Sequence, residues 1–433
     1  MLINYTFQNF RSFKNKTTLT MNAGVQRTLN ENLIRINNLR MLPSAVIYGA
    51  NASGKSNIIM SLAVMRDIIL QGSLETISPD LNNLELYPFA YTTEQAPMLF
   101  EIEFTNDGDH FVYSFEIMVN HFQKGKRQIR SEQLLMLNGK SMIEIFYRDA
   151  DKVTFNREKK VLSIIQYNEK LLQEFELKIN KNLNSTELFL PRAFKTVVSS
   201  EIAEKVLDFF KNKLVVVSDF TLKKTNLTFS LTDKTDKDFM IWNNTLDGFV
   251  KNADFGPQNI LFKSNKSEDE HSANMQLVSI YKSGEQNVMV PAELMESRGT
   301  LKLLDFALPF EGLFSKGGVF VIDEFDAAIH PELVKGIISL FNDQSVNKEG
   351  AQLIFTTHNP IYLNNQIFRR DQIRFVEKDK DNFESIIYSL ADFGSTDVRN
   401  DQNYLLNYFK GKYGTLPYID FSKLFIEGSR EDE

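Results

Sequence analysis

One eight-residue stretch constrains the fold more than any other, the run G-A-N-A-S-G-K-S from Gly49 to Ser56. In a loop of the form G-x-x-x-x-G-K-S, backbone N–H groups close around the phosphates of a nucleotide, the lysine adds a positive charge, and the serine hydroxyl serves Mg²⁺. Residues 45–48 are apolar like a short strand, and residues 57–65 have the length and apolar content of a helix. This order predicts a phosphate site made by Gly49, Asn51, Ser53, Gly54, Lys55, Ser56 and Asn57.

Composition excludes several classes of protein. A chain of 433 residues suffices for two or three structural units. The 49 Lys and Arg residues and the 56 Asp and Glu residues give a net charge of −7, the opposite of what a dedicated polyanion binder shows. The net charge leaves open whether the surface has a local basic patch. The chain has no cysteine, which excludes disulfides and thiolate metal sites and suits a reducing cytoplasm.

The N-terminal residues lack the features of a signal peptide. Residues 1–7 alternate like a strand, without a basic start and an apolar core. No apolar run approaches the roughly 18 residues that a membrane helix needs. We therefore expect a soluble, cytoplasmic protein with no membrane partner.

Alternating strands flank the phosphate loop on both sides in sequence. Residues 1–48 alternate like strands around the turn 9–14, whose Arg11 and Lys14 either reach the nucleotide or belong to an ordinary charged hairpin. Later strand-like runs are joined by turn residues at 106–109 and 138–139. These runs predict an antiparallel sheet that extends the nucleotide-binding core, within an N-terminal ATPase lobe of residues 1–190.

The character of the sequence changes near residue 195. One helical face, ending before a strand at 215–217, is apolar and contains Val198, Ile202, Val206, Phe209 and Phe210. Residues 220–290 are mixed and charged, so we expect a helical or lid-like insertion over 191–290 and a C-terminal ATPase lobe over 291–433. No segment has apolar heptads over several turns, which argues against a long coiled coil.

The C-terminal lobe contains three further candidate site segments. An apolar strand at 317–322 ends in Asp323 and Glu324, where Asp323 would hold Mg²⁺ beside Ser56 and Glu324 would polarise a water; alone, this is also a strand with an acidic turn. A second strand ends in His358, whose ring would reach the γ-phosphate. Residues 296–300 open a helix with small polar residues that could contact phosphate, although a serine cap at Ser297 explains them alone.

The four other histidines, His110, His121, His271 and His330, are interpreted as ordinary polar residues.

Five elements in this order resemble an ABC-type ATPase head, in the branch of SMC-like and OLD-family heads: the phosphate loop at 49–56, a signature at 296–300, a Walker B strand at 319–324, a D-loop at 325–328 and a switch histidine, His358. Within that branch, N-F-R-S-F at 9–13, E-S-R-G-T at 296–300, D-E-F-D at 323–326 before H-P at 330–331, and T-T-H-N-P at 356–360 are similar to AAA-type ATPases of phage-defence abortive-infection systems, the AbiL/RloA type. The resemblance covers nearly the whole chain, including residues 411–417.

This resemblance implies an α/β fold: a P-loop ABC-type ATPase head with a mixed sheet. It also implies ATP and Mg²⁺ as cofactors and a homodimer or higher homo-oligomer in which two heads meet head to tail. Each ATP would then lie between the phosphate loop of one copy and Ser297 and Gly299 of the other. The signature reads S-R-G-T here, not the S-G-G-Q of transporters. No motif fixes the Q-loop glutamine, and Gln95 is the candidate for this Mg²⁺ ligand.

The favoured function is an ATP-hydrolysing switch that senses infection and controls a separately encoded toxic effector. We expect this effector to be a nuclease. A first alternative is an SMC- or RecF-like DNA-repair or DNA-tethering head, which would need a coiled coil or a basic groove; nucleic-acid binding stays open. A second is an OLD-type ATPase with its own nuclease. We expect too little chain after His358 for that domain, and Asp379 and Asp381 fit a charged turn between two strands.

Overall fold

The central sheet brings together strands from distant parts of the chain. The computed structural model describes residues 1–36, 38–75, 86–91, 96–120, 126–218, 227–230, 240–253, 256–265, 272–394, 399 and 402–414. Its six-stranded sheet has the order β11-β17-β18-β5-β19-β20, and all neighbours are parallel except β19 and β20. The strands are β5 (Ser44–Gly49), β11 (Leu214–Val217), β17 (Gly318–Ile322), β18 (Ala351–Thr356), β19 (Ile373–Lys378) and β20 (Ser385–Ser389).

Both faces of this sheet are buried, as expected for parallel strands that are covered by helices on each side. Along β5, Ala45 and Ile47 face the core that contains α1 (Lys55–Gln71), whereas Val46 and Tyr48 face a second core. The second core is closed by α7 (Arg298–Lys316), α8 (Pro331–Asn342) and α9 (Tyr404–Phe409). The phosphate-loop helix α1 is therefore held between the central sheet and the rest of the first core.

A seven-stranded antiparallel sheet supplies the other wall of the first core. Its order is β10-β9-β8-β7-β6-β1-β2, and β6 alternates between buried and half-buried residues along its length. Tyr5 of β1 donates a hydrogen bond to Ser61 of α1 across 3.0 Å, which ties this sheet to the phosphate-loop helix. The strands are β1 (Leu2–Gln8), β2 (Thr17–Thr20), β6 (Met98–Asn106), β7 (Asp109–Asn120), β8 (Lys126–Asn138), β9 (Ser141–Asp149) and β10 (Lys152–Phe155). The predicted hairpins at 106–109 and 138–139 are confirmed.

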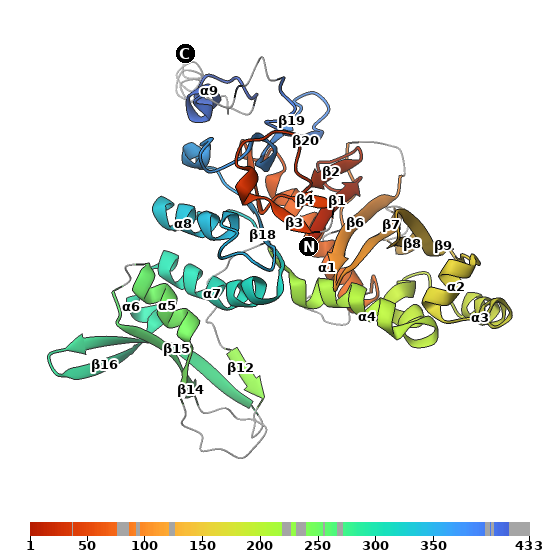
Figure 1. Ribbon diagram of the computed structural model, residues 1–433, viewed down its shortest axis with the longest axis horizontal. Helices are drawn as coiled ribbons and strands as arrows, with labels where there is room; N and C mark the ends of the chain where they lie inside the picture. The colour runs from red at the N-terminus through yellow and green to blue at the C-terminus, as the bar shows by residue number, and fades with distance from the viewer. Residues whose placement is uncertain are drawn as a thin grey trace, which may run out of the picture.

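Residues 191–290 are only partly helical, which corrects the helical half of the expectation of a helical or lid-like insertion. Figure 1 shows a third, five-stranded sheet that lies at the opposite end of the molecule's longest axis from α3 (Glu169–Lys181). Residues 275–281 lie in a strand, although Leu277 and Val278 are adjacent and break the alternation of apolar residues that would have predicted one. The sheet and its two helices comprise β12 (Leu227–Ser230), β13 (Met240–Trp242), β14 (Asn259–Asn265), β15 (Ser272–Ser283), β16 (Gln286–Pro291), α5 (Asn244–Asn252) and α6 (Ala292–Met295).

Helical segments of the same range are present upstream of that sheet. They are the π-helices η4 (Leu190–Val198) and η5 (Phe209–Lys213), with α4 (Ser200–Asp208) between them. The predicted strand at 215–217 is β11, which pairs with β17 in the central sheet.

The longest helix in the described ranges, α7, has 19 residues. The predicted class, α/β with a mixed sheet and an antiparallel extension, is confirmed. The remaining elements are η1 (Asn30–Asn32), β3 (Ile34–Ile36), β4 (Leu39–Met41), α2 (Lys159–Ile165), η6 (Pro360–Tyr362) and η7 (Arg370–Gln372).

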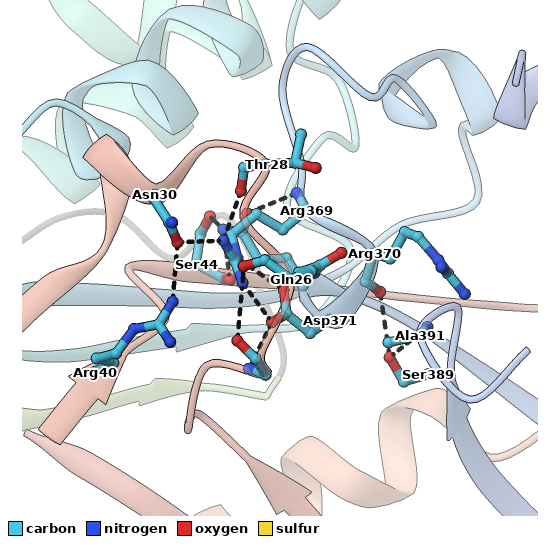
Figure 2. Close-up of polar contacts among 12 residues, drawn as sticks. Gln26, Thr28, Asn30, Arg40, Ser44, Arg369, Arg370, Asp371, Ser389 and Ala391 are labelled. Carbon is cyan, nitrogen blue, oxygen red and sulfur yellow. Dashed lines mark hydrogen bonds and ion pairs between the residues drawn. The ribbon is translucent and has the colours of Figure 1, made fainter. Parts of the chain in front are cut away.

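A buried arginine ties the N-terminal loop to the central sheet (Figure 2). Arg369 is fully buried, and its guanidinium pairs with both oxygens of Asp371 at 2.9 Å. Its other N–H groups donate to the carbonyl oxygens of Gln26 and Thr28 at 3.2 and 2.5 Å. Asp371 also accepts from the backbone N–H of Gly24 at 2.8 Å. The loop that precedes β3 is therefore fixed against the short segment 369–371 that leads into β19, the strand that borders β5.

Candidate functional site

Three strands end at the same edge of the central sheet and carry the candidate site residues there. The phosphate loop follows β5, Asp323 and Glu324 follow β17, and His358 comes two residues after β18. Because β18 lies between β5 and β17 and all three are parallel, their carboxyl ends are adjacent. Ligands of open α/β sheets bind at such an edge.

The phosphate loop has the backbone shape that its glycines allow. Gly54 precedes α1 at φ 111°, a conformation that residues with a Cβ rarely adopt. A Cβ on Gly49 would lie 2.5 Å from both Ser53 Oγ and the carbonyl oxygen of Val376, so only glycine fits. Ser53 Oγ is buried and has no hydrogen-bond partner among the described residues. The loop thus holds an unsatisfied polar atom within a tight backbone cradle.

Lys55 is the first residue of α1 and is almost completely buried. Its Nζ donates to the carbonyl oxygens of Gly49 and Ala50, both at 2.9 Å. Burial lowers the pKa of Lys55 to about 8, and the carboxylates of Asp323 and Glu324 oppose this lowering. The ammonium group thus lies inside the loop, in the field of the two acidic residues.

A group of small polar side chains holds the loop from the side of the N-terminal turn. Ser385 of β20 donates to the carbonyl oxygen of Ser53 at 2.6 Å, and its Oγ also lies 2.8 Å from Ser12 Oγ, within hydrogen-bond distance. Asn57 donates to the same Ser12 Oγ at 2.8 Å, and Arg11 donates to Asn57 Oδ1 at 3.4 Å. The structure therefore places Arg11 beside the loop; a contact with nucleotide stays a prediction.

Asp323 and Glu324 are oriented by the end of the neighbouring strand. Thr356 Oγ1 donates to Asp323 Oδ1 and accepts from the backbone N–H of Glu324 at 2.8 Å. Asp323 is half-buried, whereas the Glu324 side chain is 58% exposed. One carboxylate is thus fixed by a hydrogen bond, and the other extends into the open site.

The His358 ring lies 3.7 Å from Glu324 Oε1, measured from Nε2. Burial and the positive charge of Lys55 lower the pKa of His358, against the carboxylates of Glu324, Asp326 and Asp323. The ring is therefore neutral at pH 7, so it can both donate and accept a proton. Two other histidines have ordinary polar contacts: His110 pairs with Glu103 at 2.8 Å, and His330 caps α8.

The signature residues lie at the start of α7. Ser297 is exposed and caps this helix, since its Oγ accepts from the N–H of Thr300 at 3.1 Å. Gly299 packs on the D-loop so closely that a Cβ would lie 2.1 Å from the carbonyl oxygen of Ala328. Within the described ranges, no hydrogen bond or ion pair joins Ser297 or Gly299 to the phosphate loop of the same chain.

The donor set fits a magnesium nucleotide. The loop offers backbone N–H groups, the ammonium of Lys55 and the unsatisfied Ser53 Oγ for phosphate oxygens. Ser56 Oγ and the Asp323 carboxylate are hard oxygen ligands of the kind that Mg²⁺ prefers. The predicted ligand Gln95 lies outside the described residues, as do His121 and His271.

Sequence reasoning missed the residues that hold these groups in place. Thr356 could have been noticed, because a polar residue follows the apolar run of residues 353–355 at the end of the strand beside the histidine. Ser12 and Ser385 carry no such signal, since their contact joins parts of the chain 373 positions apart. The turn that contains Asp379 and Asp381 connects β19 and β20, as predicted, and Asp379 accepts hydrogen bonds from two backbone N–H groups within it.

Comparison with protein families decides the broader class. Residues 44–364, well over half of the chain, match the family described as "AAA domain, putative AbiEii toxin, Type IV TA system". The chain belongs to this family. As a member of this AAA family, it is an AAA-type ATPase domain, and its matched range includes the phosphate loop, the signature, Asp323, Glu324 and His358. No curated protein matches the chain.

Among solved structures, two SMC heads are similar to this chain. The SMC head domain from Thermotoga maritima is 15% identical, with 90% of this chain and 98% of that chain covered and a TM-score of 0.36. The Smc head domain with an extended coiled coil, bound to the C-terminal domain of ScpA and derived from Pyrococcus furiosus, is 14% identical, with 90% and 96% covered and a TM-score of 0.41. At these values the likeness carries no functional argument. None of the helices in the described ranges is both long enough and apolar enough to cross a membrane.

Proposed function

We propose that this AAA ATPase is the nucleotide switch of a phage-defence system of the abortive-infection type, similar to AbiL/RloA ATPases. Two copies close head to tail around two ATP molecules and control a separate toxic effector. Lys55 and the loop N–H groups bind the phosphates, and Ser56 and Asp323 hold Mg²⁺, which would offset the phosphate charge. Glu324, with neutral His358 beside it, orients and polarises the attacking water.

The observation that carries this proposal is the division of the site between two surfaces. Lys55, Asp323, Glu324 and His358 converge at one edge of the central sheet. Ser297, by contrast, is exposed at the start of α7 and is not bonded to that edge in its own chain. A second copy that supplies Ser297 and Gly299 would complete the site, so that ATP bridges the copies and biases them toward a closed dimer.

Control of a separate effector is supported by what the described residues lack. Among them, no group of three or more His, Cys, Asp or Glu residues is arranged to hold a metal ion. The net charge of −7 suits a surface that binds protein without a basic footprint. An ATP-dependent switch with a protein partner accounts for these features.

Glu324→Gln tests the catalytic half of the proposal. The amide keeps the shape of the side chain but is a poor base, so ATP affinity should stay near that of the wild type while steady-state hydrolysis falls by roughly 100-fold or more. Hydrolysis is measured by phosphate release and affinity by nucleotide titration. The variant should also accumulate as a dimer in the presence of ATP. A wild-type hydrolysis rate in this variant would contradict the role of Glu324.

The family description favours a second candidate, in which the chain itself is the toxin of a toxin–antitoxin pair. Expression of the chain alone in phage-challenged cells separates the two. A switch that needs an effector leaves growth unchanged and gives no protection, whereas a toxin stops growth by itself. Co-purification of the native complex then identifies the effector or the antitoxin.

A further inference from the structure

A lysine lies buried in the apolar stripe of the signature helix. Lys302 occupies the face of α7 that also carries Gly299, Phe306 and Phe310, and only 3% of it is exposed. A charged side chain at such a position is rarely buried unless it is paired. Its partners therefore indicate what it does.

The Lys302 ammonium group is bonded to the turn that follows the Walker B strand. Its Nζ donates to the carbonyl oxygen of Glu324 at 2.7 Å and to that of Ala327 at 3.3 Å. The two carbonyl groups belong to one turn, in which the N–H of Ala327 also donates to the carbonyl oxygen of Glu324 at 3.1 Å. Burial lowers the pKa of Lys302, and the carboxylates of Asp326, Glu324 and Asp323 oppose this lowering.

The backbone of this turn is in a conformation that needs support. Glu324 and Ala328 both have positive φ, 46° and 66°, which costs free energy for residues that carry a Cβ. Gly299, which lies on α7 as Lys302 does, packs against the carbonyl oxygen of Ala328. The first turns of α7 therefore hold the segment 324–328 at both of its ends.

The exposed carboxylate of Glu324 depends on that backbone for its direction. Its side chain is 58% exposed, and His358 Nε2 at 3.7 Å is beyond hydrogen-bond distance. Its backbone is held by Thr356 at the N–H and by Lys302 at the carbonyl oxygen. A small rotation of the turn would move the carboxylate away from the water that it is proposed to polarise.

We propose that Lys302 is a positioning residue for ATP hydrolysis, which couples the signature helix α7 to the catalytic carboxylate of its own chain by fixing the turn 324–327. The inference rests on the proposed function, because it takes Glu324 as the group that acts on water. Lys302 itself does not touch the nucleotide, so its loss slows hydrolysis without weakening ATP binding. Displacement of a reacting group by about 1 Å is enough to cost roughly 100-fold in rate.

The test compares four variants of the full chain by phosphate release and ATP titration. In Lys302→Met, a side chain of similar length fills the same space without the two hydrogen bonds, and kcat should fall by about 100-fold while the Kd for ATP changes by less than about threefold. Lys302→Arg keeps charge and donors and should recover part of kcat. Lys316→Met, at the exposed end of the same helix, should behave like the wild type. Glu324→Gln is the inactive reference.

Three outcomes would overturn the inference or its basis. If Lys302→Met hydrolyses ATP within about twofold of the wild type while Glu324→Gln is inactive, Lys302 does not position the carboxylate. If Lys302→Met loses ATP binding and thermal stability together with activity, and Lys302→Arg does not recover kcat, its role is only structural. If Glu324→Gln itself hydrolyses ATP normally, the proposed function fails, whatever Lys302 does.

Discussion

Lys55 titrates near neutral pH because the loop removes it from water. Its pKa of about 8 means that the free protein carries the positive charge at pH 7 and loses it as pH rises through that value. The phosphates of ATP stay ionised over this range. Since only the protonated amine offsets phosphate charge, binding above pH 8 must take up a proton.

We therefore predict that ATP affinity falls between pH 7 and pH 9.5, by at most about tenfold per pH unit above the pKa. Calorimetric titration in buffers of different ionisation enthalpy would detect the proton uptake. Lys55→Arg keeps its charge throughout and should show a flat profile at lower affinity, whereas Lys55→Ala should bind roughly 100-fold more weakly or not at all. A flat profile for the wild type would show that Lys55 stays protonated.

The positions of single residues at the ends of elements were predictable where a short motif fixes them. Lys55, Ser56, Asp323 and His358 belong to short motifs. Each lies at the start of a helix or just after a strand whose boundary the sequence indicates. Ser385 and Lys302 have partners that are close only in the folded chain, as with Ser385 and Ser12. No local pattern encodes such contacts, so these residues needed the structure.

Among the elements, the loop between β2 and β3 depends on one buried ion pair. Arg369 and Asp371 are both buried, and Arg369 also holds the carbonyl groups of that loop. Removal of one partner leaves a buried charge, so Arg369→Met should lower the free energy of unfolding by about 3–5 kcal/mol. Arg130→Met is the matched control: its pair with Asp149 at 2.7 Å is exposed, and the change should cost less than about 1 kcal/mol.

Urea unfolding followed by circular dichroism measures both variants under the same conditions. Equal midpoints for Arg369→Met and Arg130→Met would mean that the loop is held by other contacts. The strand before this loop was predicted because residues 18–21 alternate, whereas the sheet within 220–290 was not, since its strands carry many polar residues. Periodicity identifies an element only where one face is apolar.

At the scale of the whole molecule, the proposed dimer makes a prediction that no single variant tests. Ser297→Arg and Lys55→Ala should each abolish hydrolysis alone, because each removes one half of every composite site. In a mixed dimer, one site joins an intact loop to an intact signature, and the other carries both defects. With equal amounts and random exchange, about a quarter of the wild-type rate should return.

The two variants are purified separately and then mixed. A label on one of them follows the exchange of chains between dimers, and hydrolysis is measured in the mixture. If mixed dimers form and no activity returns, the signature works within its own chain or both sites must act together. Lys55→Ala mixed with Glu324→Gln is the matched control. Since both changes lie in the half-site that binds and hydrolyses ATP, neither site of that mixed dimer is complete.

The contact between Ser12 and Ser385 has a consequence for how the protein is made. These residues close on the phosphate loop from sequence positions 373 apart, so the loop is translated early and its lateral support late. Contacts of such wide sequence separation form slowly, and a ribosome adds only about 5–20 residues per second. A nascent chain that already contains Lys55 must therefore wait for β20 before its phosphate loop is held as in the finished protein.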